Sequence, residues 1–126
     1  MLGALIGDIV GSVFEWNPHK SKEFKLVAEQ TRFTDDSVMT IAAADALLHG
    51  RDYLTVYKHW GRAYPHAGYG SKFKNWMQTD GSETQDSFGN GSAMRVSPVG
   101  WAFETLEEVL DEAKKSAEPS HGHPEG

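Results

Sequence analysis

The sequence contains no cysteine, and positive charge is scarce in it: it has 12 Lys and Arg residues and 18 Asp and Glu residues, for a formal net charge of −6. Without cysteine, disulfide bonds, zinc–thiolate sites and thiol nucleophiles are excluded, and we expect a cytoplasmic protein. An acidic surface repels both phosphate backbones and anionic lipids. We therefore expect neither nucleic acid nor a membrane among the partners.

Long apolar runs are also missing. The apolar N-terminal segment lacks a basic leader and is interrupted by Gly7 and Asp8, so it has the pattern of neither a signal peptide nor a membrane span. A chain of 126 residues is a suitable size for one domain. Repeats, low-complexity linkers and the alternating pattern of a strand are absent as well. The expected class is therefore all-α.

Helical spacing is clear in several segments. Residues 2–14 carry apolar side chains three and four positions apart, residues 34–50 read as a cap, a helix and a glycine stop, and a further helix is expected over 52–62. Residues 91–103 have a helical pattern interrupted by Pro98, and Thr105 with Glu108 predicts a capping box for the helix that follows.

Three glycines recur at every fourth position of the first predicted helix. Gly3, Gly7 and Gly11 form a stripe that allows another backbone to approach closely, at a cost of about 1 kcal/mol of helix propensity each. Glu15 would extend this stripe by one turn. Asp8 and Glu15, seven positions apart, would then lie nearly in line along the helix.

The stretch "RFTDDSVMT", residues 32–40, allows two interpretations. Thr34 or Asp35 would cap the following helix, whose N-terminus favours negative charge by about 0.3 to 1 kcal/mol per acidic residue. Alternatively, a hydroxyl and the two carboxylates of Asp35 and Asp36 are hard oxygen donors of the kind that Mg²⁺ or Mn²⁺ takes. A metal would need further ligands from elsewhere, and spacing alone favours the cap.

Two other stretches carry candidate binding residues. In "SFGNGSAMR", residues 87–95, glycines on both sides of Asn90 permit positive φ, and the amides at 91–93 could converge on an anion such as a diphosphate; the simpler interpretation is an Asn-Gly turn. In "EPSHGHPEG", His121 and His123 lie in a polar context, where histidines are usually solvated.

Taken together and in order, "GALIGDIVGSVFE", "FTDDSVMTIAAADALL", "SFGNGSAMRVSPVGW" and "SAEPSHGHPEG" resemble the successive motifs of the ADP-ribosylglycohydrolases, the dinitrogenase-reductase-activating glycohydrolase family. The resemblance implies an all-α, orthogonal multi-helix fold with a dinuclear Mg²⁺ or Mn²⁺ centre. It also implies hydrolysis of the bond that joins ADP-ribose to a protein side chain or small molecule.

The resemblance assigns roles to individual residues. Thr34, Asp35 and Asp36 would be metal ligands, and Glu15 and Asp36 would be catalytic, with Glu15 beside the metals as base, acid or ligand. The remaining implied residues contact ADP-ribose or line its cleft, and these are Gly89, Asn90, Gly91, Ser92, Met94 and His121.

The family pattern continues beyond this sequence. Members are roughly twice as long, and their second half carries an Asp-x-Asp-Thr type motif that completes the metal site. Asp80 and Asp86 in loops do not reproduce it. The chain therefore resembles an N-terminal half, within which Ser120 and Pro124 predict the start of one more helix. We expect exposed apolar faces at 1–14 and 38–48, and a homo-oligomer or a complementing chain that covers them. The alternatives to an enzyme are an ADP-ribose-binding module without activity and a truncated remnant that self-associates.

Overall fold

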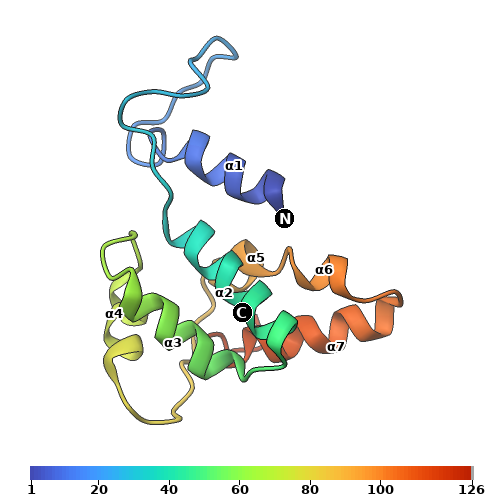
Figure 1. Cartoon of the computed structure of the whole chain (residues 1–126). Coiled ribbons are helices and arrows are strands. Elements are labelled where there is room, and N and C mark those ends of the chain that lie inside the picture. Colours follow the sequence, from blue (N-terminus) through green and yellow to red (C-terminus); the bar gives the residue numbers. More distant parts are fainter. Residues whose placement is uncertain (126) are drawn as a thin grey trace.

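The computed structural model describes residues 1–125, and over this range it is helical, as expected (Figure 1). The only β pairing among these residues is an isolated bridge between Asp86 and His121. None of the described helices is long and apolar enough to cross a membrane. The helices are α1 (Leu2–Gly11), α2 (Asp35–His49), α3 (Tyr53–Ala63), α4 (Ser71–Gln78), α5 (Gly91–Arg95), α6 (Val99–Ala102) and α7 (Leu106–Ala117).

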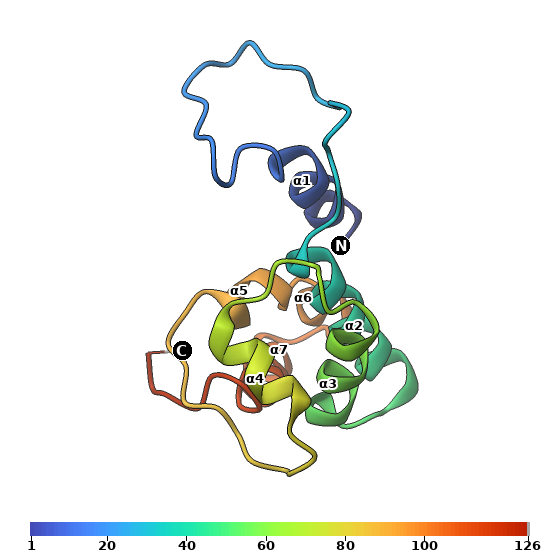
Figure 2. The same ribbon diagram turned by 90° about the vertical axis from the view of Figure 1, so that its left-hand side faces the viewer.

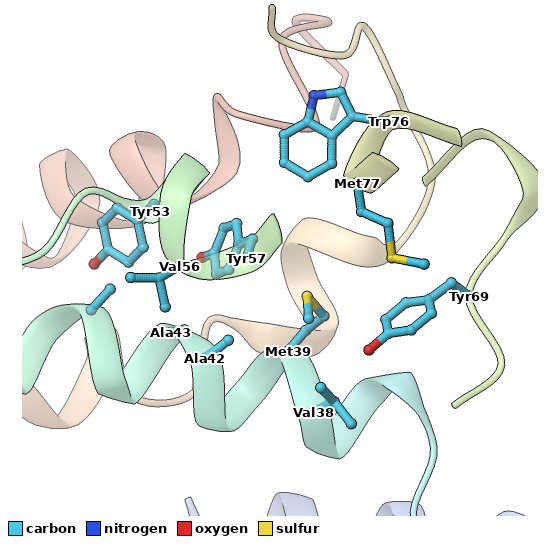
Figure 3. Close-up of a cluster of buried hydrophobic side chains, with 11 residues drawn as sticks. Val38, Met39, Ala42, Ala43, Tyr53, Val56, Tyr57, Tyr69, Trp76 and Met77 are labelled. Carbon is cyan, nitrogen blue, oxygen red and sulfur yellow. The ribbon is translucent and has the colours of Figure 1, made fainter. Parts of the chain in front are cut away.

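The core lies between α2, α3 and α4 (Figure 3). Small and flexible side chains of α2, among them Met39 and Ala42, face the aromatic Tyr57 of α3 and the side chain of Met77 on α4. All four are at most 2% exposed. Since α2 packs its apolar residues inward, the expectation that the face of residues 38–48 would be exposed is wrong for most of that segment, and Leu48, 81% exposed, is the exception.

Helix α1 is different, because it has no buried residue. Leu2 is 72% and Ile6 is 61% exposed. Figure 2 shows α1 and the long connection to α2 at one end of the molecule, where α1 lies beside the start of α2. Exposed apolar side chains were expected over residues 1–14, and the structure confirms this part of the prediction.

The first helix is also shorter than its apolar spacing predicts. It ends at Gly11, and the Ser12 hydroxyl donates to the carbonyl of Ile9 (2.9 Å) while accepting the amide of Arg32 (3.1 Å). Glu15 therefore does not lie on the helix in line with Asp8. The glycine stripe does not receive another backbone either, since within the described residues no atom lies within 4 Å of a Cβ built on Gly3, Gly7 or Gly11.

Most of the helix ends that the sequence predicts elsewhere are present in the structure. Asp52 caps α3, the capping box of Thr105 and Glu108 forms on α7, and Gly50 ends α2 with a left-handed φ of 59°. The helix expected from Ser120 does not form in residues 120–125, because the His121 amide still donates to Ala117 in a turn after α7 and the backbone then pairs with the segment around Gln85.

Candidate active site

The N-terminus of α2 is held by a carboxylate from another helix. Asp8 of α1 accepts the backbone amides of Thr34 (2.8 Å) and Ser37 (3.2 Å), and it also accepts both of their hydroxyls, each at 2.5 Å. Thr34 is the N-cap, and its hydroxyl oxygen accepts the Asp36 amide at 3.3 Å. The capping interpretation of this stretch is thus satisfied by Thr34 and Asp8, which leaves the two following carboxylates free of that role.

Asp35 and Asp36 form a crowded acidic pair with no cation beside them. Within residues 1–125, no Lys, Arg or His forms an ion pair with either carboxylate. Burial raises the pKa of Asp35 to about 6, and the nearby charges of Asp36 and Glu15 act in the same direction. Burial and the charge of Asp8 likewise raise the pKa of Asp36. Negative charge is therefore under-compensated at this helix start.

Two neighbouring pockets meet at this pair. The first, which we call the acidic pocket, has a volume of about 490 Å³ and lies between α1, the start of α2 and α5. Asp36 and Glu15 line it, together with Gly7 and Gly11 of the glycine stripe. The stripe thus opens onto a pocket in this structure, and Glu15 reaches that pocket from the turn after α1.

The second pocket, which we call the loop pocket, measures about 370 Å³ and is lined by Asp35 and by the segment 89–91. His121 closes one side of it, although it lies 30 residues farther along the chain. Asn90 and Met94 line both pockets, so the two are adjacent. Residues that the sequence singled out in four separate stretches therefore surround one continuous region.

The segment between α3 and α4 completes the loop pocket. Gly68 has φ of +118°, a conformation reserved for glycine, and a Cβ there would lie 3.1 Å from an Asp35 carboxylate oxygen. Tyr69 is 4% exposed and lines the pocket, and its hydroxyl is buried without a hydrogen-bond partner in the described structure. Helix α4 begins beside it at Ser71, with no side-chain cap on its first amides. These donors are free to bind an acceptor-rich ligand.

Gly91 is a glycine for a reason that the sequence did not indicate. The sequence permits positive φ at Gly89 and Gly91, but neither adopts it, and Asn90 lies in a turn that leads directly into α5. Instead, a Cβ on Gly91 would lie 2.8 Å from Cε1 and 3.1 Å from Nε2 of His121. The missing side chain admits the imidazole ring against the start of α5.

His121 is not a solvated tail residue. It is 8% exposed, and burial, with a smaller effect of the Arg95 charge, lowers its pKa to about 4. Ser92, in contrast, lies outside the loop pocket and lines a separate hollow on the other side of His121. The structure therefore brings Gly89, Asn90, Gly91, Met94 and His121 together and leaves Ser92 apart.

The oxygen donors of this region have the chemistry that a divalent cation needs, but they are too few to complete a metal site. Asp35 and Asp36 supply hard oxygen atoms of the kind that Mg²⁺ or Mn²⁺ requires, and no side chain among the described residues forms an ion pair with them. However, within residues 1–125 the His, Asp and Glu side chains form no group of three or more that could hold a metal ion. Thr34, the third implied ligand, already donates its hydroxyl proton to Asp8.

Comparison with known proteins decides the family. The model of the family described as ADP-ribosylglycohydrolase matches residues 1–126. The chain belongs to the ADP-ribosylglycohydrolase family.

Curated members of this family resemble the chain along nearly its whole length. It is 28% identical to ADP-ribosylhydrolase ARH3 of Homo sapiens over 158 aligned residues, which cover 96% of this chain and 43% of that protein. The corresponding protein of Mus musculus is 26% identical, with 96% and 42% covered, and that of Xenopus tropicalis 24%, with 96% and 43% covered. The chain thus spans less than half of the length of these relatives. No solved structure matches it.

Sequence reasoning missed three residues that shape this region. In the sequence, Asp8 stands out as an interruption of the apolar segment and by its alignment with Glu15, and neither feature indicates its role as an external cap of α2. Tyr69 stood in a segment that reads simply as a loop. Arg95, 1% exposed, gave no signal, because a basic residue at the end of a short helix is ordinarily solvated.

Proposed function

We propose that this chain supplies the acidic and ligand-binding part of a site that hydrolyses the bond between ADP-ribose and an acceptor, with Mg²⁺ or Mn²⁺ as cofactor. The observation that carries the proposal is the meeting of two pockets: Asp36 and Glu15 line one, the segment 89–91 and His121 line the other, and Asn90 and Met94 are common to both. Family membership supports the reaction class.

The loop pocket suits a ligand rich in acceptor oxygens. The unpartnered hydroxyl of Tyr69 and the uncapped amides at the start of α4 line it, and these are donors that a diphosphate accepts. His121 adds a ring nitrogen on the opposite side. An anionic ligand beside Asp35 would be repelled, since that carboxylate already lies among other negative charges. A cation between ligand and carboxylates removes this conflict.

Asp35 and Asp36 would hold that cation, with Thr34 as a further oxygen donor through the remaining lone pair of its hydroxyl, whose proton Asp8 accepts. A bound divalent ion supplies Lewis-acid activation of water and orientation of ribose hydroxyls. Glu15 is exposed and lines the same pocket as Asp36, so its carboxylate is placed to exchange a proton with water in that pocket. Ligands beyond this chain would complete a dinuclear centre.

The test is metal binding measured by calorimetry. We expect the chain to bind Mg²⁺ more weakly than a relative of full length, and the double variant Asp35→Ala with Asp36→Ala to lose this binding. Asp111→Ala is the matched control, because Asp111 is an exposed carboxylate on α7 that lines neither pocket. Binding of Mg²⁺ by the double variant as tight as by the parent would refute the assignment of these ligands. Loss of stability alone, with metal binding retained, would assign both residues to the helix start only.

A second candidate function is an ADP-ribose-binding module without turnover. Two observations favour it: the Thr34 hydroxyl is engaged by Asp8, and the described residues form no group of three or more potential metal ligands. Under this alternative, ADP-ribose binds the loop pocket equally well with and without Mg²⁺. Dependence of ADP-ribose affinity on the metal therefore separates the two candidates.

A further inference from the structure

A buried arginine lies behind the pocket histidine. Arg95, at the end of α5, is 1% exposed, and its guanidinium lies over the ring of Tyr57 at 4.1 Å. Its Nη2 atom donates to the carbonyl of Ser116 (2.9 Å) and to the hydroxyl oxygen of Ser120 (2.8 Å). Arg95 thereby joins α5 to the last turn of α7 and to the segment that follows it.

Ser120 contacts both Arg95 and His121. It is completely buried, and its hydroxyl oxygen lies 2.8 Å from Nδ1 of the His121 ring. A guanidinium can only donate, so the Ser120 oxygen accepts from Arg95 and its own proton is left to donate. The acceptor for that proton is Nδ1 of His121. In a neutral ring with Nδ1 as acceptor, the proton is on Nε2.

The other tautomer would leave a buried donor unpaired. If Nδ1 carried the proton and donated to Ser120, the hydroxyl proton of Ser120 would need a different acceptor, and the described structure provides none. Unpaired buried polar hydrogens are strongly disfavoured. The doubly protonated ring would also leave the hydroxyl proton of Ser120 without an acceptor. In addition, its charge would lie near the positive charge of Arg95, in keeping with the lowered pKa of His121.

The opposite edge of the ring faces the ligand side. Nε2 lies 3.1 Å from the position of a Cβ on Gly91, the ring lines the loop pocket, and no acceptor for Nε2 is recorded among residues 1–125. We propose that Arg95 and Ser120 are positioning residues that fix His121 as the Nε2–H tautomer, so that the ring donates a hydrogen bond to an acceptor oxygen of bound ADP-ribose. The identity of the ligand rests on the proposed function, whereas the tautomer does not.

The decisive measurement is ¹⁵N NMR of the histidine rings at neutral pH, with His121 assigned by its loss in a His121→Gln variant. In the parent chain, we expect Nδ1 of His121 to resonate as an unprotonated nitrogen and Nε2 as a protonated one. Ser120→Ala deletes a single oxygen and should shift His121 toward a mixture of tautomers. Ser116→Ala is the matched control, since this serine is equally buried, its hydroxyl donates to Ala113, and the backbone carbonyl that accepts from Arg95 is kept in the variant.

Ligand binding provides a second readout. We expect Ser120→Ala to weaken ADP-ribose binding about tenfold, the loss of one well-placed hydrogen bond, and Ser116→Ala to leave the affinity unchanged. A protonated Nδ1 in the parent chain overturns the inference, and so does an unaltered His121 tautomer in folded Ser120→Ala. If Ser120→Ala does not fold, the parent spectrum alone still decides. If the parent binds no ADP-ribose, the proposed function fails while the tautomer result stands.

Discussion

At the scale of single residues, the site depends on two glycines that other side chains approach so closely that a larger residue would not fit. His121 reaches the loop pocket only because Gly91 has no side chain, and Asp35 keeps its position beside a glycine at positive φ, Gly68. Both glycines lie in segments that read as ordinary turns. Their importance comes from side chains that approach them from 30 or more residues away.

Gly91→Ala should therefore damage the site. Its Cβ would meet the His121 ring at 2.8 Å, so that either the ring or the start of α5 must move. We expect a loss of about 1–3 kcal/mol in the free energy of unfolding and clearly weaker ADP-ribose binding, measured by denaturation and calorimetry. Gly100→Ala in α6, where nothing lies within 4 Å, should leave the affinity unchanged and should raise the free energy of unfolding, by about 0.5–1 kcal/mol. Unaltered affinity in folded Gly91→Ala would contradict the placement of ADP-ribose in the loop pocket.

His121 should also make stability depend on pH. Its pKa is about 4 in the folded chain and near 6.5 when unfolded, so the unfolded state binds more protons between these values. The stabilisation is fully present above pH 6.5 and is lost as the pH falls toward 4. We expect its contribution to the slope to reach at most about 1.4 kcal/mol per pH unit.

The comparison is between urea denaturation series at several pH values. His121→Gln should flatten the dependence between pH 4 and 6.5, whereas His59→Gln, at an exposed position on α3, should leave it as in the parent. Equal slopes for the parent and His121→Gln would show that the ring is solvated in solution.

At the scale of elements, α1 is joined to the rest of the chain mainly through polar contacts. It has no buried residue, and its best-defined link is the Asp8 carboxylate at the start of α2. Its apolar residues Leu5 and Ile9 line a small hollow against α2 and α3 without being buried. Asp8 is therefore both an external cap for α2 and an anchor for α1.

Asp8→Ala should separate these two helices. Two buried hydroxyls and two amides lose their acceptor, at a cost of about 1–3 kcal/mol for each group left unpaired and unhydrated. We expect amide hydrogen exchange to become fast throughout α1 and at the first turn of α2. Asp111→Ala on α7, where the side chain is exposed, is the control. Exchange in α1 that stays as slow as in the parent would show that apolar contacts hold the helix.

Sequence reasoning succeeded where the determinant is local. The helical class, the N-cap at Thr34, the stop at Gly50 and the capping box at Thr105 all follow from residues within one turn of each other, and the structure confirms them. It failed where contacts are distant. The end of α1 depends on Ser12 binding Arg32, and the ring of His121 depends on Arg95, pairs that no periodicity can reveal.

For the candidate site too, sequence reasoning found the residues that lie in recognisable motifs and missed those that depend on distant contacts. Motif resemblance named the acidic pair and the segment 89–91, and the structure brings them to two adjacent pockets. It could not indicate Tyr69, whose role depends on the path of the chain between α3 and α4. It also could not exclude Ser92, which is adjacent in sequence to Gly91 but lies on the other side of His121.

At the scale of the whole molecule, several large apolar side chains are exposed, and the chain matches less than half of the length of its relatives. Leu2 of α1, Trp101 of α6 and Leu106 of α7 are each more than 70% exposed. The chain matches only 42–44% of the length of the ARH3 proteins. Burying such side chains would be worth about 1.5–3 kcal/mol each. We expect a second polypeptide segment, from a copy of this chain or from a complementing chain, to cover them.

The activity of the 126-residue chain distinguishes an enzyme part from a binding module. With two unpartnered carboxylates and no complete group of metal ligands among the described residues, the chain alone should release little ADP-ribose from ADP-ribosylated peptides in Mg²⁺. Addition of the C-terminal part of the Homo sapiens relative should restore release, and Glu15→Gln or Asp36→Asn should abolish it. Restored release that withstands both substitutions would exclude these carboxylates from catalysis. Turnover by the chain alone at about 1 s⁻¹ or faster would mean that a second copy or the loop carboxylates Asp80 and Asp86 complete the metal site, because a typical enzymatic rate requires a fully assembled centre.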